Sequence, residues 1–169
     1  ILLASNSPRR RELLAGLDID YRVTALPEVD ESYLDTLSGE EIPLYISQEK
    51  AAAYRRFMKD NTLLITADTI VWLDGKVYGK PRNTADAKAM LQALSGKTHT
   101  VITGVTLTSL QKQISFAVST EVTFAALGDD EIDYYVETYR PLDKAGAYGV
   151  QEWIGYIGVT GLKGSYYNV

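Results

Sequence analysis

A cluster of positive charge lies close to the amino terminus, in the segment Ser5–Arg11, which reads SNSPRRR. The pattern predicts a helix with Ser7 as its N-cap and Pro8 at its first position. Three arginines then occupy the positive end of the helix dipole, where each costs roughly 0.3–1 kcal/mol. Helix amino termini and arginine side chains both bind phosphate oxygens. The segment therefore predicts a phosphate site, and a basic turn exposed to solvent is the alternative.

A single carboxylate, Asp68, follows the apolar residues 62–67, which we expect to form a buried strand that ends at this aspartate. Burying a carboxylate is unfavourable unless it pairs with a cation or a metal. Ligands bind at the carboxyl ends of strands in open α/β sheets. We therefore expect Asp68 to hold a divalent cation or to activate water opposite the phosphate site. An aspartate that caps the following turn is the alternative.

Other polar residues that could complete such a site are spread along the chain. Glu31 lies in an acidic loop with Glu28 and Asp30, and oxygen ligands of this kind suit Mg²⁺ or Mn²⁺ rather than Zn²⁺. Lys50 falls on a predicted helix, where residue type alone favours a lysine in solvent. Lys80 lies in the stiff loop GKPR, which could direct it inward.

The segment 143–151, DKAGAYGVQ, is rich in small residues. Glycine allows the backbone to approach a ligand closely, so this loop is a second candidate binding element. An ordinary connection between a helix and a strand is the alternative. His99, the only histidine, lies in a predicted strand, and we expect it to be structural.

The composition is that of a globular protein and excludes several classes. The 169 residues are 46% hydrophobic and carry a net charge of -5, which argues against a nucleic-acid partner, because phosphate contacts need a basic face. The chain has no cysteine and one histidine, so thiolate and multi-histidine metal sites are excluded. No apolar run approaches the roughly 18–20 residues of a membrane span, and the start does not read as a signal peptide. The chain does not begin with Met, and we expect it to be a segment of a longer protein.

Strands alternate with helices in the early part of the chain that must position these residues, and strands pair directly with one another later. We expect strands at 1–5, 20–26 and 62–67, helices at 8–16, 43–59, 84–95 and 129–138, an acidic loop at 27–41, a hairpin at 73–76, a long antiparallel pair at 98–109 and 113–126, a loop at 140–151, and a final strand pair at 153–159 and 164–169. This order predicts an α/β or α+β layered fold around a mixed sheet.

Five motifs in order resemble those of the Maf family of nucleoside triphosphate pyrophosphatases. They are SNSPRR at 5–10, ADTIV at 67–71, GKP at 79–81, LSGKTH at 94–99 and PLDKAGAYGVQ at 141–151. The resemblance covers almost the whole chain, so residues 1–169 are expected to form a single Maf-like domain. The family typically continues past the final GSYYNV with a turn and a last helix, so we expect a carboxyl-terminal segment to be missing.

The resemblance implies a fold and a reaction. The fold is that of the inosine triphosphate pyrophosphatases, a mixed twisted sheet with flanking helices and two lobes around a central cleft. The reaction is hydrolysis of dTTP or UTP to the monophosphate and pyrophosphate with Mg²⁺ or Mn²⁺ as cofactor. Asp68 matches the family's base, with Glu31, Lys50 and Lys80 as further catalytic residues, and Asp68 and Glu31 are expected to bind the metal.

The resemblance also assigns substrate contacts. Ser5, Arg9 and Arg10 match the phosphate-binding loop, to which we add Ser7 as the second serine of that loop. Arg10, Thr69 and Gln151 match the positions that separate the dTTP/UTP branch from a branch acting on 7-methyl-GTP. Glutamine carries both a carbonyl and an amide, so it could pair with the O4 and N3–H edge of uracil or thymine.

Two other functions stay open. One is a pyrophosphatase for 7-methyl-GTP or another modified purine triphosphate, and the other is a nucleotide-binding regulator of septum formation. In each case we expect a cytoplasmic homodimer with no nucleic-acid or membrane partner.

Overall fold

A computed structural model of the chain describes residues 1–25 and 28–169. Its strands form a seven-stranded mixed sheet, with β4 (Lys76–Tyr78) paired to β3 outside the main path. The order along that path is β2 (Arg22–Thr24), β1 (Leu2–Ala4), β3 (Leu64–Leu73), β5 (Thr98–Thr108), β6 (Gln113–Phe124) and β7 (Val159–Lys163). The chain divides into two compact units, Ile1–Asp68 with Thr103–Val118, and Thr69–Ile102 with Ser119–Val169. The mixed α/β prediction is confirmed. Among the described residues, no helix combines the length and the apolar character that crossing a membrane requires.

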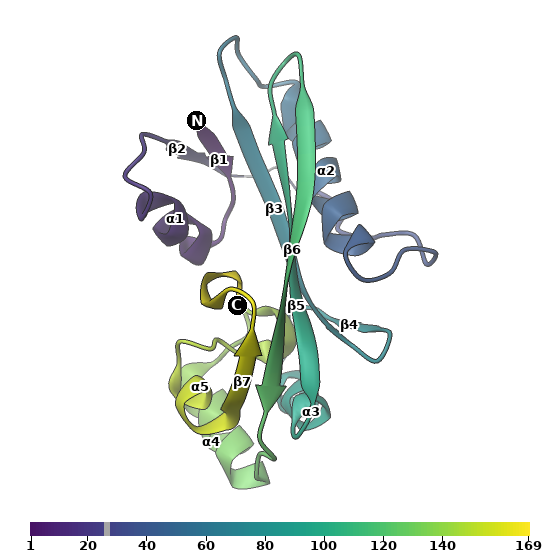
Figure 1. Ribbon diagram of the computed structural model, residues 1–169, viewed down its shortest axis with the longest axis vertical. Coiled ribbons are helices and arrows are strands. Elements are labelled where there is room, and N and C mark those ends of the chain that lie inside the picture. Colours follow the sequence, from purple (N-terminus) through teal and green to yellow (C-terminus); the bar gives the residue numbers. More distant parts are fainter. Residues whose placement is uncertain (26–27) are drawn as a thin grey trace. The chain divides into compact units, whose positions relative to one another are not determined.

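Four elements of the first unit precede the long strands (Figure 1). They are β1 (Leu2–Ala4), α1 (Pro8–Ala15), β2 (Arg22–Thr24) and α2 (Glu41–Arg55). Strand β1 runs parallel to both β2 and β3 (Leu64–Leu73), and it meets only the first two residues of β3, Leu64 and Ile65. Leu26 and Pro27, where the predicted strand 20–26 meets the predicted acidic loop, lie outside the described residues.

Helix α2 packs on one face of β3 through buried side chains of both elements. Ala51 joins Leu64 and Ala4 in a small buried cluster, and the Thr66 hydroxyl donates to the Ser47 carbonyl at 2.7 Å. The helix begins two residues before the predicted start, with Pro43 as its third residue. Proline is tolerated there because the first amides of a helix have no intrahelical partner.

A glycine on β5 (Thr98–Thr108) allows the start of α2 to approach the sheet. A Cβ on Gly104 would lie against the Pro43 carbonyl group and 2.6 Å from the Leu44 nitrogen. We expect Gly104→Ala to destabilise the fold by about 1–3 kcal/mol, because backbone atoms cannot yield as a side chain does. Urea unfolding measures this, with Gly161→Ala as control, since its Cβ would meet Thr123 at an ordinary 3.5 Å. Equal stability of the two variants would contradict the close approach.

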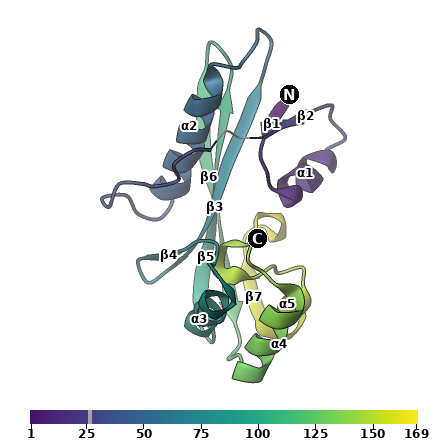
Figure 2. The same cartoon turned by 180° about the vertical axis from the view of Figure 1, so that it is seen from behind.

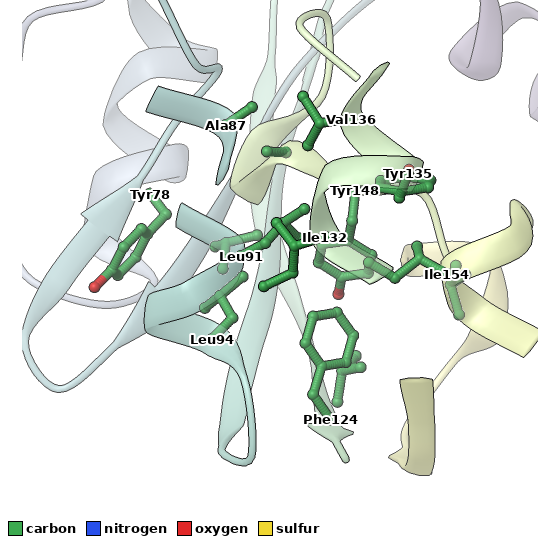
Figure 3. Packing of buried hydrophobic residues seen from close by; sticks show 14 of the residues in the cluster. Tyr78, Ala87, Leu91, Leu94, Phe124, Ile132, Tyr135, Val136, Tyr148 and Ile154 are labelled. Carbon is green, nitrogen blue, oxygen red and sulfur yellow. The ribbon is translucent and has the colours of Figure 1, made fainter. Parts of the chain in front are cut away.

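The second unit is built around one large apolar core (Figure 3). Its elements are β4 (Lys76–Tyr78), α3 (Thr84–Leu94), α4 (Asp129–Tyr139), α5 (Trp153–Gly158) and β7 (Val159–Lys163), with the carboxyl-terminal part of β6 (Gln113–Phe124). Helices α3 and α4 pack together through Leu91, Leu94, Ile132 and Val136, all fully buried. The predicted hairpin is confirmed, because Asp74 and Gly75 both have positive φ between the paired residues Leu73 and Lys76.

Two predicted strand assignments are wrong. Strand β3 does not end before Asp68 but runs through it to Leu73, because Ile70, Val71 and Leu73 stay buried on the same strand. The predicted final strand pair is instead the helix α5, the strand β7 and a 3-10 turn at Tyr166–Asn168. A short apolar run such as WIGYIG suits a helix or a strand, and packing decides between them.

His99 is buried in this core, in agreement with its predicted structural role. Its Nε2 lies 2.6 Å from the Tyr148 hydroxyl, and its ring contacts Phe124 and Tyr148 edge-on. Burial lowers the pKa of His99 from 6.5 to about 4. The folded ring therefore stays neutral in a range where the unfolded chain binds a proton.

The lowered pKa predicts a loss of stability as the pH falls from 6.5 to about 4. The unfolded state binds more protons in this window, so the contribution of His99 is present above it and falls by up to about 3 kcal/mol across it. Urea unfolding of the wild type and His99→Gln at several pH values measures the difference, because carboxylate effects are common to both. An identical pH slope for the two proteins would contradict the assignment.

Candidate active site

A buried lysine joins two carboxylates in the first unit. The Lys50 ammonium lies 2.9 Å from Asp68 Oδ1 and 2.9 Å from Glu31 Oε1. The side chains of Lys50 and Asp68 are only 6% and 12% exposed, whereas Glu31 is 57% exposed. Lys50 comes from α2, Asp68 from β3, and Glu31 from the acidic segment before α2 (Figure 2). Three separate parts of the chain thus bring one positive and two negative side chains together.

The backbone next to Asp68 is held by two cations. Carbonyl groups alternate between the two edges of a strand, so the Ala67 carbonyl faces the same edge as that of Leu63, which accepts from the Leu2 amide at 2.8 Å. Strand β1 ends at Ala4 and supplies no further amide there. Arg10 Nη1 donates to the Ala67 oxygen at 2.9 Å, and Lys50 Nζ donates to it at 3.4 Å. Arg10 and Lys50 thus take the place of a strand partner at the Ala67 carbonyl, next to Asp68.

The segment between β1 and α1 is fixed by hydrogen bonds of Ser5. Ser5 is buried, its amide donates to the Thr24 carbonyl at 3.1 Å, and its hydroxyl accepts from the Ser7 amide at 3.1 Å. Helix α1 begins at Pro8 with Ser7 as N-cap, as predicted, although the Ser7 side chain makes no capping hydrogen bond. The first turn contains no acidic residue.

The charges of this segment face the carboxylates. Burial lowers the pKa of Arg10 from its ordinary value, and the nearby charges of Asp68 and Glu31 act in the opposite direction. Arg9 adds a like charge beside Arg10. In the acidic loop, Asp30 instead accepts a hydrogen bond from the Ser32 amide at 2.9 Å, which lowers its own pKa. Glu31 is thus the carboxylate of this loop that reaches Lys50.

The second unit contains the other candidate residues. Thr69 lies on β3, Lys80 follows β4, and Gln151 lies in the glycine-rich loop; Lys80 and Gln151 are exposed. The Gly146 amide donates to the Gly79 carbonyl at 3.1 Å, so the loops of Lys80 and Gln151 are joined directly. Gly146 has a φ of +68, and a Cβ there would lie 2.8 Å from Val71 Cγ2. This join therefore requires glycine.

Comparison with known proteins identifies the family. The profile described as Maf-like protein matches residues 1–169. The chain belongs to the Maf family. Three Maf relatives, each named dTTP/UTP pyrophosphatase, match all of this chain. The protein from Phocaeicola vulgatus is 66% identical and that from Bacteroides fragilis 62%, with 88% of each relative covered. The protein from Flavobacterium psychrophilum is 48% identical, with 86% covered.

A solved structure supports the fold assignment. The Staphylococcus aureus Ham1 protein superposes with a TM-score of 0.53 over 92% of this chain and 89% of that one, at 19% identity. At this identity the likeness concerns the fold alone. It agrees with the mixed-sheet fold expected from the Maf motifs.

The structure brings together the residues of the first unit that the Maf resemblance places in the site. Arg10 and Lys50 both donate to the Ala67 carbonyl, Lys50 also pairs with Asp68 and Glu31, and Ser5 makes hydrogen bonds in the segment before α1. Residue type alone predicted a lysine in solvent at position 50, and this is wrong. Lys50 lies on the buried stripe of α2 beside Ala51. A lysine in an apolar stripe at helical spacing was the signal that could have shown it.

The carboxylates fit a hard divalent cation. Asp68 and Glu31 both reach the same ammonium, so their oxygens lie close to one point. Within the described residues there is no cluster of three or more acidic, histidine or cysteine side chains that could hold a metal ion. Mg²⁺ is commonly held by one or two carboxylates together with substrate phosphates. Asp68 and Glu31 therefore suit a cation that binds with the substrate.

Proposed function

We propose that this Maf protein hydrolyses dTTP and UTP to the nucleoside monophosphate and pyrophosphate. The observation that carries the proposal is the buried Asp68, held by Lys50 beside the arginine-rich turn. A carboxylate in such a setting can accept a proton from water, and the turn offers phosphate-binding groups next to it. The names of the Maf relatives support the choice of substrate.

In this proposal the residues of the first unit have separate roles. Arg9 and Arg10, with Ser5 and Ser7, bind the phosphate oxygens, and the two arginines offset their charge. Lys50 fixes the orientation of Asp68. Asp68 orients a water molecule and takes its proton as the water oxygen bonds to the α-phosphorus. The bond from the α-phosphorus to the bridging oxygen then breaks, and pyrophosphate leaves with the electron pair.

Positioning and charge supply most of the catalysis, because no side chain forms a covalent bond with the substrate. Lys80 is proposed as a further phosphate contact. A divalent cation, held by Asp68 and Glu31, would supply additional neutralisation of phosphate charge. It would take its other ligands from phosphate oxygens and water, in keeping with two protein carboxylates.

We further propose that Arg10, Thr69 and Gln151 select the base. The side-chain amide of Gln151 can donate to O4 of uracil or thymine, and its carbonyl can accept from N3–H. The exposure of Gln151 leaves its side chain accessible to a ligand. A homodimer, a cytoplasmic location and a role in septum formation stay predictions.

Pyrophosphate release from a panel of nucleoside triphosphates tests the proposal. We expect release from dTTP and UTP to exceed release from CTP, ATP, GTP and 7-methyl-GTP, in the presence of Mg²⁺ or Mn²⁺. Release mainly from a methylated or otherwise modified purine would keep the reaction and overturn the base assignment. Metal-dependent binding of dTTP without any turnover would contradict the catalytic proposal and favour the nucleotide-binding regulator.

A further inference from the structure

A tight turn carries Gln151. The Glu152 amide donates to the Gly149 carbonyl at 3.0 Å, so Val150 and Gln151 occupy the two central positions. Val150 is buried in the core of the second unit, whereas Gln151 is exposed. The conformation of this turn therefore decides where the Gln151 side chain begins.

One buried hydroxyl connects both ends of the turn. The Tyr135 hydroxyl accepts from the Gly149 amide at 3.1 Å and donates to Glu152 Oε1 at 2.9 Å. Tyr135 lies on α4 and is fully buried in the apolar core (Figure 3). Burial raises the pKa of Tyr135 well above its ordinary value, so the hydroxyl keeps its proton and remains a donor. A phenylalanine here would fill the same space and lose both bonds.

The carboxylate that accepts the hydrogen bond from Tyr135 is itself held in place. Lys144 Nζ lies 3.4 Å from Glu152 Oε1 and 3.1 Å from Asp143 Oδ1. Gly149 provides the space for this arrangement, because a Cβ there would lie 2.7 Å from Glu152 Oε1. The turn is thus fixed from α4 on one side and from its own loop on the other.

We propose that Tyr135 is a positioning residue for base selection, acting through the Gly149–Glu152 turn on Gln151. This inference rests on the proposed role of Gln151. Uracil presents an acceptor at position 4 and a donor at N3, and cytosine presents the reverse. A glutamine amide that is free to turn over can satisfy either base, because its donor and acceptor ends exchange. A fixed turn holds the start of the Gln151 side chain at one place beside the base, so the preference that Gln151 provides weakens when the turn loosens.

The test compares kcat/KM for UTP and CTP in the wild type and in Tyr135→Phe. We expect the UTP-to-CTP ratio to fall by about tenfold, the size of effect that one hydrogen bond has on an equilibrium. The change should lie mainly in KM, with kcat for UTP within about twofold of wild type, because Tyr135 does not contact the proposed catalytic groups. Glu152→Ala removes the other end of the same bond at a more exposed position, and it should move the ratio in the same direction.

Tyr148→Phe is the matched control. It also deletes a buried tyrosine hydroxyl of this unit, the one bonded to His99, but it leaves both ends of the turn untouched. It should lower the thermal stability and leave the UTP-to-CTP ratio unchanged. A fall in the ratio for both tyrosine variants in proportion to their loss of stability would overturn the positioning role.

Gln151→Ala tests the base assignment separately from the positioning role of Tyr135. If it reduces the ratio whereas Tyr135→Phe and Glu152→Ala do not, the inference about Tyr135 fails and the base assignment stands. If Gln151→Ala has no effect, or if the wild type does not distinguish UTP from CTP, the base assignment fails and the inference fails with it.

Discussion

Asp68→Asn is expected to fold and to lose turnover by about 10²–10⁴-fold. Asparagine has nearly the same shape as aspartate, but it cannot take a proton from water at neutral pH. The substitution also leaves Lys50 paired with Glu31, which lies 2.9 Å from the same ammonium. Pyrophosphate release from dTTP measures the loss, and thermal unfolding shows that the variant is folded.

A surface carboxylate provides the control for this experiment. Asp133 lies 3.0 Å from Lys88 and is 59% exposed, so it also pairs with a lysine but outside the candidate site. Asp133→Asn should keep full turnover. Near-normal turnover of Asp68→Asn would refute the role of Asp68 as base.

Lys50→Met is expected to destabilise the fold by about 3–5 kcal/mol, because it removes the ammonium that pairs directly with the buried Asp68 carboxylate. Methionine is close to lysine in length, so the loss of charge rather than of volume dominates. The Ala67 carbonyl also loses one of its two donors. Turnover should fall as well, because Asp68 is no longer held in one orientation. Urea unfolding and pyrophosphate release measure the two effects.

Lys88 offers the same geometry at the surface. Its ammonium lies 3.0 Å from Asp133 and 2.9 Å from Glu137, and both carboxylates are more than half exposed. Ion pairs in solvent contribute about 0–1 kcal/mol, so Lys88→Met should change the stability by no more than that. A similar, small effect of the two substitutions would mean that Lys50 is not the buried partner that Asp68 requires.

The proposed mechanism and the proposed base selection involve different units. The charged residues Arg10, Glu31, Lys50 and Asp68 belong to the first unit. Thr69, Lys80 and Gln151 belong to the second unit, where the hydrogen bond from Gly146 to Gly79 joins the loops of Lys80 and Gln151. The predictions separate accordingly, with loss of turnover for Asp68 and Lys50 and a change of preference for Gln151 and Tyr135.

The elements that depend on local interactions were predicted well. The hairpin at Asp74–Gly75 follows from the positive φ that these residues tolerate, and the start of α1 follows from Ser7 and Pro8. The apolar segment WIGYIG was predicted as a strand and forms a helix. Its six residues are too few to distinguish the two periods, so contacts with the rest of the unit decide.

Local sequence determined which chemical groups this protein offers. A serine- and arginine-rich helix start predicts a phosphate site, and an aspartate within an apolar run predicts a buried carboxylate, because both arguments need only neighbouring residues. Which of these groups lie next to one another was decided by the tertiary structure alone. Lys50 reaches Asp68 because α2 places its buried stripe on one face of β3, and Arg10 reaches the Ala67 carbonyl because β1 ends early. Such pairings depend on helix phase and strand register, which packing sets across residues distant in the chain.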